Sequence, residues 1–439
     1  MDGALTPQDM SPGLLKVAVR ARREPDAQFH SVAHLIDVAA LERAYHRSRK
    51  DAAVGVDGVT KQAYGRDLDA NLQDLHGRLK AMRYRHQPIR RVHIPKDKGR
   101  TRPLGISAFE DKIVQDALRE VLQAVYEQDF LECSYGFRPR RRAHDAIRAF
   151  DRVASRGEVN WVLEADIKSF FDSVDRNTLL ELLRIRVPDG SIKRLVGKCL
   201  HVGVLDGGEF TTPDTGTAQG SVLSPLLANV YLHYALDLWF EREVKPRLHG
   251  RSTLIRYADD FIICFELRSD AERVMGALSG RLAKFALTLE PTKTRLIPFH
   301  RPSPKETRGK GPATFDFLGF TLFWRRTRRG GWCVGCKTRH ARLRRAIAAV
   351  YDWCRSHRHL SIPVQHAALT RRIRGHFNYF GVNGNQRSLG RLYHHARRAW
   401  FKWLCRRSQK QRLNWERFVD LLRDFPIPRP RVYVKIWGT

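Results

Sequence analysis

The sequence has few acidic residues for its length and few features of secreted or membrane proteins. Its 439 residues include 46 Asp and Glu against 79 Lys and Arg. The seven cysteines are odd in number and scattered, apart from Cys333 and Cys336, which favours reduced thiols in a cytosolic compartment. No apolar run approaches the roughly 20 residues of a membrane span, and residues 1–16 lack the apolar segment of a secretory signal. We therefore expect a cytoplasmic protein without a membrane partner.

The excess of basic residues is the strongest compositional signal. The formal net charge is +33, and 42% of the residues are hydrophobic, which is enough to build cores. A charge of this size predicts a polyanionic partner, with nucleic acid ahead of a membrane surface or an acidic protein.

Apolar spacing predicts an α+β chain. Residues 1–16 are expected to form a ragged, partly ordered leader. Helical patterns cover residues 30–64 (with a turn at 55–58), 67–82, 111–128, 219–244 and 269–285, and strand patterns cover residues 90–95, 102–106, 161–167 and 315–324. Residues 252–265 predict a β-hairpin with a tight turn at Ala258-Asp259, and we expect a domain boundary near residues 325–331.

Two sets of carboxylates indicate catalysis. Asp259 and Asp260 are adjacent at the predicted hairpin tip, and Asp166 ends another apolar strand. Neighbouring carboxylates repel each other, so folding gains nothing from this placement. Mg²⁺ prefers hard oxygen ligands, and two strand ends side by side could hold two Mg²⁺ ions about 3.5–4 Å apart for displacement at phosphorus.

An ordered series of motifs carries a family resemblance. The motifs are Gly55-Val56-Asp57-Gly58-Val59, Arg102-Pro103-Leu104-Gly105-Ile106, Ser134-Tyr135-Gly136-Phe137-Arg138-Pro139, Ala165-Asp166-Ile167-Lys168-Ser169-Phe170-Phe171-Asp172, Gln219-Gly220-Ser221-Val222-Leu223-Ser224-Pro225, Tyr257-Ala258-Asp259-Asp260 and Phe317-Leu318-Gly319-Phe320. With them, the chain resembles the reverse transcriptases (intron maturases) encoded by bacterial group II introns. Motif order and number make this resemblance specific.

The resemblance implies a right-hand polymerase fold of fingers, palm and α-helical thumb. It implies an N-terminal extension over residues 1–65, fingers over 66–160, a palm over 161–325, a thumb (maturase domain) over 332–405, and a short basic nucleic-acid-binding segment over 406–439. It also implies a bacterial cytoplasmic protein that copies intron RNA into DNA and stabilises the intron for splicing and retrohoming. The implied partners are intron RNA, a DNA target or primer, and deoxynucleotides; the sequence does not say whether the protein dimerises.

The same resemblance assigns site residues. Asp166, Asp259 and Asp260, with the carbonyl of Ile167, would hold two Mg²⁺ ions. The family's Pro-Gln-Gly-Gly is here Ala218-Gln219-Gly220-Ser221, which keeps the pocket glutamine. The residues assigned to the nucleotide are Lys96, Arg102, Phe171, Gln219 and Lys293. Phe171 would exclude a ribose 2′-hydroxyl.

Residues 337–415 contain nineteen Lys and Arg and one acid, Asp352, interleaved with aromatics. Cations track phosphates, whereas most of the aromatics are expected to be core of a helical thumb. The cations predicted to bind nucleic acid are Arg397, Arg398, Lys402 and Arg406.

Several alternatives remain open at this stage. Related enzymes serve phage-defence or CRISPR-linked systems, and intron RNA flanking the gene would distinguish them. The others are a splicing-only RNA-binding maturase, which primer extension would distinguish, and an RNA-dependent RNA polymerase, which would extend with ribonucleotides. No His-Asn-His nuclease pattern follows residue 431, so target nicking is expected to come from elsewhere. A structural metal at Cys333, Cys336 and His340 is not expected, because no second Cys pair is nearby.

Overall fold

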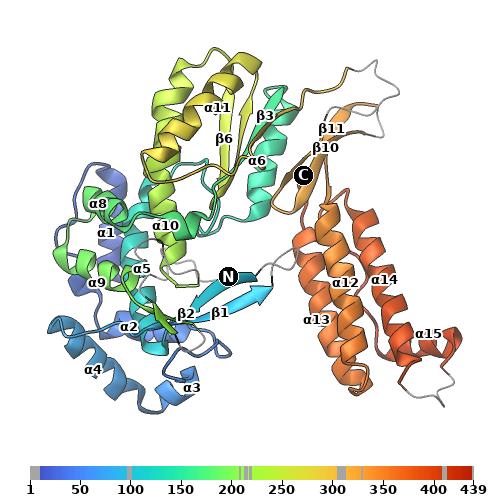
Figure 1. The fold of residues 1–439 in the computed structure, drawn as a ribbon, viewed down its shortest axis with the longest axis horizontal. Coiled ribbons are helices and arrows are strands. Elements are labelled where there is room, and N and C mark those ends of the chain that lie inside the picture. The colour runs from blue at the N-terminus through green and yellow to red at the C-terminus, as the bar shows by residue number, and fades with distance from the viewer. Residues whose placement is uncertain are drawn as a thin grey trace. The chain divides into compact units, whose positions relative to one another are not determined.

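The computed structural model describes residues 10–95, 101–206, 209–211, 216, 220–303, 313–327, 330–407 and 413–437 (Figure 1). The chain forms two compact units. The first comprises residues 1–142, 165–263 and 269–295, and the second comprises residues 143–164, 264–268 and 296–439.

The helices and strands are as follows. The α-helices are α1 (Pro12–Arg23), α2 (Val38–Arg47), α3 (Lys61–Tyr64), α4 (Leu68–Lys80), α5 (Phe109–Asp129), α6 (Ala143–Ser155), α7 (Phe170–Ser173), α8 (Arg176–Arg186), α9 (Gly190–Leu200), α10 (Ser224–Leu232), α11 (Arg268–Ala283), α12 (His340–Ser356), α13 (Ile362–Phe380), α14 (Gln386–Leu404) and α15 (Trp415–Asp424). The strands are β1 (Ile89–Pro95), β2 (Thr101–Ile106), β3 (Trp161–Asp166), β4 (Val204–Asp206), β5 (Glu209–Thr211), β6 (Ser252–Tyr257), β7 (Asp260–Phe265), β8 (Arg295–Pro298), β9 (Phe315–Phe317), β10 (Phe320–Arg326) and β11 (Trp332–Thr338).

Helix α5 is the central element of the first unit. Most of its side chains between Phe109 and Tyr126 are buried, and it packs against α1 and α2. A small sheet in the order β2-β1-β4-β5 lies in the same unit. Its β1–β2 hairpin is antiparallel, with Arg90 opposite Ile106 and Ile94 opposite Arg102. The strands expected over residues 90–95 and 102–106 and the helix expected over 111–128 are confirmed.

A second sheet has the order β6-β7-β3-β8. Its strands are short, and β7 is strongly apolar: every residue from Phe261 to Phe265 is buried. Asn160, just before β3, donates its backbone N–H to the carbonyl of Phe265 at the end of β7 (2.9 Å). Adjacent strands β3 and β7 therefore run antiparallel, so the end of β3 and the start of β7 lie at one edge of the sheet.

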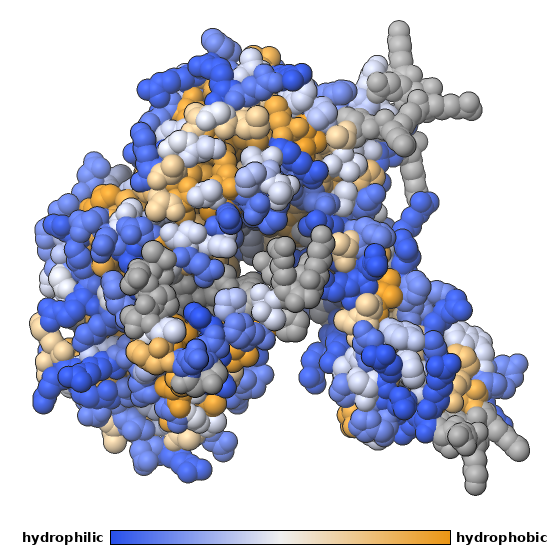
Figure 2. Space-filling view, in the orientation of Figure 1, coloured by the Kyte–Doolittle hydropathy of each residue, from blue (hydrophilic) through white to orange (hydrophobic). Residues whose placement is uncertain are grey.

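The second unit contains α6, the β11-β10-β9 sheet and the helices α12–α15. Helices α12, α13 and α14 lie side by side in Figure 1 and share one apolar core. Trp400 lies fully buried in this core and donates its indole N–H to Gln365 Oε1 (3.0 Å). Most of the surface of these helices in Figure 2 is hydrophilic.

Two predicted elements differ from the structure because of local backbone chemistry. The helix expected over residues 219–244 begins at Ser224, where Pro225 suits the first turn because its missing N–H has no intrahelical partner there. The single strand expected over residues 315–324 is a hairpin. Leu318 and Gly319 have φ angles of 51° and 79°, and two successive positive φ values make a tight hairpin turn.

One further expectation is corrected: the helical pattern expected over residues 30–64, with a turn at 55–58, holds only a short 3-10 turn, α2 and α3. The partly ordered leader expected over residues 1–16 carries the start of α1, whose Leu14 is buried. The boundary expected near residues 325–331 stays a prediction; Arg326 pairs there with Trp332 in the β10–β11 hairpin. In the part of the chain that the structure describes, no helix is long and apolar enough to cross a membrane.

The core of the helical bundle generates a stability prediction. Trp400→Ala removes a fully buried indole and leaves Gln365 Oε1 without its hydrogen-bond donor. We therefore expect the free energy of unfolding to fall by about 3–5 kcal/mol. The change is measured by urea denaturation followed by circular dichroism. Val364→Ala, at an exposed position on α13, is the control and should have little effect. A loss below about 1 kcal/mol for Trp400→Ala would show that this core is not packed as described.

Candidate active site

The turn between β6 and β7 presents two carboxylates. Ala258 has a φ of 58°, which is uncommon for a non-glycine residue, and it sharply reverses the chain after Tyr257. Asp259 therefore lies in the turn and Asp260 begins β7, and both are half-buried. The predicted hairpin over residues 252–265 is confirmed.

Asp166 ends β3 at the same edge of the sheet. Its backbone carbonyl accepts a hydrogen bond from Glu290 N (2.8 Å), and Lys168 N donates to the Thr288 carbonyl (2.8 Å). This pairing does not use the carbonyl of Ile167, which lies between the two bonds. The structure thus brings Asp166 and Ile167 to the sheet edge that also carries the Asp259-Asp260 turn.

Lys293 lies on Asp166. Its ammonium group contacts Asp166 Oδ2, and this hydrogen bond raises the pKa of Lys293 above its ordinary value, with further attraction from Glu290 and Asp260. Sequence reasoning assigned Lys293 to the nucleotide. The structure places it at the carboxylate that is predicted to bind metal.

The carboxylate oxygens suit a magnesium site that the substrate completes. Among the described residues, no group of three or more His, Cys, Asp or Glu is close enough to form a metal cage. Mg²⁺ commonly takes one or two protein carboxylates and fills its other positions with water and substrate phosphates. The donors Asp166 and Asp259 fit that pattern.

The two phenylalanines after Asp166 have different surroundings. Phe170 is buried and packs edge-on against Tyr231, with ring centroids 6.4 Å apart. Phe171 is only half-buried, and its ring meets that of Phe170 edge-on at 5.4 Å. Phe170 is therefore a core residue, whereas part of the Phe171 ring is accessible to a ligand.

The loop that follows Gln219 packs against β2. A Cβ added to Gly220, whose φ is 114°, would lie 2.4 Å from the Gly105 carbonyl oxygen, so only glycine fits this contact. Ser221 donates its hydroxyl to Gln115 Oε1 (3.0 Å), which also accepts the N–H of Val222 (3.1 Å). This buried Gln115 holds the loop in place, and sequence reasoning missed it.

Of three further predicted nucleotide contacts, the structure describes only one, and that one in part. Lys96 and Gln219 lie outside the described residues. Arg102 has a described backbone, paired with Ile94 in the β1–β2 hairpin, but its side chain is not described.

Sequence reasoning also missed Arg256 as a residue that supports the site. It is fully buried in β6, between Ile255 and Tyr257, and it forms a bidentate ion pair with Asp237 (2.7 and 2.6 Å). A charged residue directly after the apolar pair Leu254-Ile255 in a predicted strand was the available signal, because buried charges require partners.

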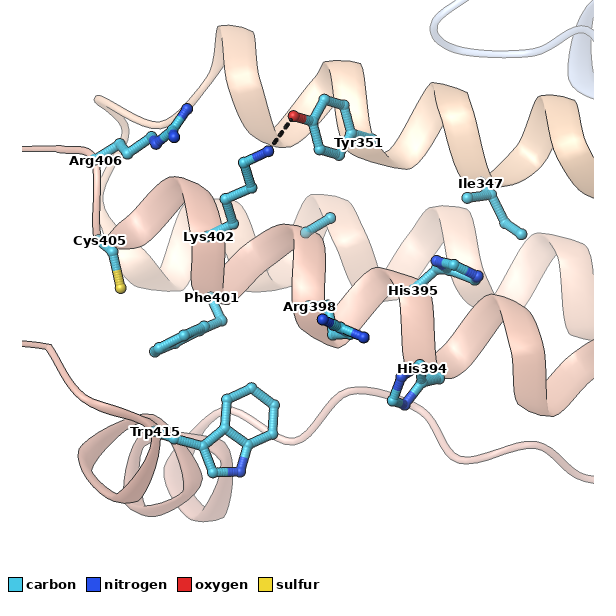
Figure 3. Close-up of a pocket in the computed structure, with 11 residues that line it drawn as sticks. Ile347, Tyr351, His394, His395, Arg398, Phe401, Lys402, Cys405, Arg406 and Trp415 are labelled. Atoms are coloured by element: carbon cyan, nitrogen blue, oxygen red, sulfur yellow. Dashed lines mark hydrogen bonds between the residues drawn. The ribbon is translucent and has the colours of Figure 1, made fainter.

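The four predicted thumb cations divide into two groups. Arg398, Lys402 and Arg406 are exposed, follow one another at intervals of four residues, and line a pocket of about 760 Å³ (Figure 3). In Figure 3, Lys402 reaches Tyr351 of α12 and donates to its hydroxyl (2.8 Å). Arg397 instead is half-buried, with its guanidinium over the rings of Tyr393 and Trp415 (5.6 and 5.5 Å). It packs α14 against α15, while the other three present their charges to solvent.

A family model described as reverse transcriptase (RNA-dependent DNA polymerase) matches residues 94–322, which is more than half of the chain. The chain therefore belongs to the reverse transcriptase family, and it is an RNA-directed DNA polymerase.

Individual relatives refine this assignment. The chain is 33% identical to Protein YkfC of Escherichia coli (strain K12), over 72% of this chain and 88% of that protein. It is 34% identical to the group II intron-encoded protein LtrA of Lactococcus lactis subsp. cremoris, over 47% of this chain and 35% of LtrA. It is also 27% identical to nuclear intron maturase 2, mitochondrial, of Arabidopsis thaliana, over 31% of this chain and 24% of that protein. The resemblance to intron-encoded reverse transcriptases is confirmed, although the chain spans only about a third of LtrA.

Proposed function

We propose that this polymerase copies the RNA of a group II intron into DNA, and that it binds and stabilises the same RNA during splicing and retrohoming. The observation that carries the polymerase site is the placement of Asp166 beside the Asp259-Asp260 turn at one edge of an apolar sheet. The partners would be intron RNA, a DNA target or primer, and deoxynucleotides, in the bacterial cytoplasm.

In this proposal the fold is a right hand. Residues 66–160 form the fingers, residues 161–325 the palm and residues 332–405 the thumb, with residues 1–65 as an extension and 406–439 as a basic segment. The reverse transcriptase family supports this assignment. Asp166, Asp259 and Asp260 would hold two Mg²⁺ ions, which stabilise charge on the attacking and leaving oxygens when bound.

The other residues would orient the substrate. Phosphate contacts would come from Lys96, Arg102 and Lys293, since cations beside a triphosphate neutralise its charge. Lys293 is already held at the site by Asp166. Gln219 would line the nucleotide pocket, and Gly220 and Ser221 support it, because they anchor its loop to Gly105 and Gln115.

The catalytic carboxylates generate the first test. Asp166→Ala or Asp259→Ala should reduce primer extension on an RNA template to below a few per cent, because positioning and metal binding supply most of the catalysis. RNA binding, measured by filter retention, should hold, because removing a negative charge cannot weaken attraction to phosphate. The control is Asp69→Ala, which removes an exposed carboxylate on α4. Extension by either catalytic variant close to that of the control would refute the site, whereas a wild-type protein that extends no primer would favour a splicing-only protein.

The exposed thumb cations generate a second prediction. Changing Arg398, Lys402 and Arg406 together to Gln should weaken binding of intron RNA and flatten its salt dependence. Each lost phosphate contact lowers the slope of log affinity against log salt by about 0.7–0.9. The charge-matched control is Gln at Arg242, Lys245 and Arg247, which are exposed in the first unit. Equal slopes in the two triple variants would mean that total charge, rather than this surface, attracts the RNA.

Phe171 generates a prediction about sugar selectivity. Its ring lies five residues after Asp166, and a hydroxyl buried against it without a hydrogen-bond partner costs about 1–3 kcal/mol. Wild type should therefore use deoxynucleotides, and Phe171→Ala should incorporate ribonucleotides at least several-fold more readily in single-nucleotide assays. Phe170→Ala, which opens the core, should chiefly lower stability. Unchanged discrimination in Phe171→Ala would remove this ring from the pocket, and efficient ribonucleotide use by wild type would favour an RNA polymerase.

A further inference from the structure

Arg256 uses every hydrogen-bond donor that it has. Its guanidinium is fully buried, and each of its five N–H groups meets a different acceptor oxygen. The acceptors are the two carboxylate oxygens of Asp237 (2.7 and 2.6 Å), Ser134 Oγ (2.7 Å), Asn229 Oδ1 (3.0 Å) and the carbonyl oxygen of Ala258 (3.0 Å). A guanidinium with all five donors satisfied has a single orientation.

The ion pair keeps Arg256 charged inside the protein. Burial disfavours the charged form, but the adjacent carboxylate of Asp237 outweighs burial, so the pKa of Arg256 is raised above its ordinary value. Both side chains of the pair are 0% exposed. Such a pair gives little net stability compared with apolar packing, and its value lies more in holding one specific arrangement.

The arrangement that Arg256 holds is the Asp259-Asp260 turn. The accepted carbonyl belongs to Ala258, the residue with a φ of 58° that directly precedes Asp259. The opposite side of the turn is held by Gly136. A Cβ on Gly136 would lie 2.2 Å from the Ala258 nitrogen, and the Gly136 carbonyl accepts from Asn229 Nδ2 (2.7 Å).

Three separate sequence motifs therefore meet behind one turn. The segment 134–139 contributes Ser134 and Gly136, helix α10 contributes Asn229, and β6 contributes Arg256 itself. We infer that Arg256 is a positioning residue for catalysis: it fixes the Ala258 carbonyl and thereby the direction in which Asp259 and Asp260 present their carboxylates. This inference rests on the proposed function of those carboxylates in metal binding.

Arginine is required for this role because of its shape. Lysine would keep the charge opposite Asp237, but its single nitrogen carries three donors and cannot reach the five acceptors that the planar guanidinium spans. In Arg256→Lys the contact to the Ala258 carbonyl should be lost while the buried charge remains paired.

The test compares Arg256→Lys with Arg186→Lys in the full chain. Arg186 is the matched control: it is 4% exposed, forms a bidentate pair with Asp129 (2.8 and 3.0 Å), and also donates to backbone carbonyls near α1. Both variants should lower thermal stability. At a temperature where both are folded, backbone amides of residues 257–260 should exchange with deuterium faster in Arg256→Lys than in Arg186→Lys or wild type.

Metal binding gives a second readout. Mn²⁺ binding to the protein alone is followed by electron paramagnetic resonance, with Asp259→Ala as the baseline. Changing a residue that orients a metal ligand typically costs 10- to 100-fold in metal affinity or activity. We expect Arg256→Lys to weaken Mn²⁺ binding by about 10-fold or more, and to raise the Mg²⁺ concentration for half-maximal extension similarly. Arg186→Lys should leave both values unchanged.

Gly136→Ala is a second variant that perturbs the same turn from its opposite side. It keeps the test decisive if Arg256→Lys does not fold. Its Cβ must displace the Ala258 nitrogen, so it should reproduce the metal defect while keeping the Arg256 ion pair. Wild-type exchange and Mn²⁺ affinity in the folded Arg256→Lys variant, with extension reduced only in proportion to the folded fraction, would overturn the positioning role.

The outcomes also separate this inference from the proposed function. If Asp259→Ala extends primers normally, the proposed catalytic site is wrong, and the Mn²⁺ and Mg²⁺ measurements no longer report on catalysis. If Asp259→Ala is inactive but Arg256→Lys binds metal and exchanges like Arg186→Lys, only the role of Arg256 is refuted. If wild type binds no Mn²⁺ above the Asp259→Ala baseline, the exchange rates of residues 257–260 alone decide whether Arg256 positions the turn.

Discussion

Carboxylates held at one sheet edge repel one another, and the charged side chains beside and behind them answer that constraint. Two unit charges 4 Å apart interact by about 4 kcal/mol at the effective dielectric constant near a protein surface. Cations offset this repulsion in the structure: the Lys293 ammonium lies on Asp166, and the buried Arg256 guanidinium lies behind the turn that carries Asp259. The first cation is exposed enough to move when a metal or a phosphate arrives, whereas the second is enclosed and permanent.

The local parts of this arrangement could be predicted from the sequence. Two apolar stretches on either side of a small residue and two aspartates were enough to predict the β6–β7 hairpin and its turn. The partners of Arg256 could not be found in this way, because Ser134, Asn229 and Asp237 lie 122, 27 and 19 residues away in the chain. Periodicity reports which face a residue occupies, but it carries no information about which distant segment packs there.

Backbone effects of single residues account for most differences between expectation and structure. Apolar content from Phe315 to Trp324 favoured one strand, yet Leu318 adopts a positive φ that an apolar residue seldom takes. In the helical bundle of α12–α15, composition separated aromatics from cations but could not distinguish neighbours on one helix. Arg397 and Arg398 are adjacent in the sequence, and a rotation of about 100° between successive helical residues sends one toward Trp415 and the other to solvent.

The proposed catalytic site and the exposed cations of α14 place opposite demands on side-chain mobility. Catalysis at phosphorus requires ligand oxygens fixed to within a fraction of an ångström, and side chains are held that closely when packing and further hydrogen bonds lock them. Buried Arg256 and Gln115 supply such support behind the turn and behind the loop after Gln219. The phosphate attraction that we propose for α14 is long-ranged and tolerates motion, so Arg398 and Arg406 can remain exposed. A chain with a net charge of +33 can therefore attract RNA over a broad surface and still confine the carboxylates that we propose to bind metal to one tight turn and one strand end.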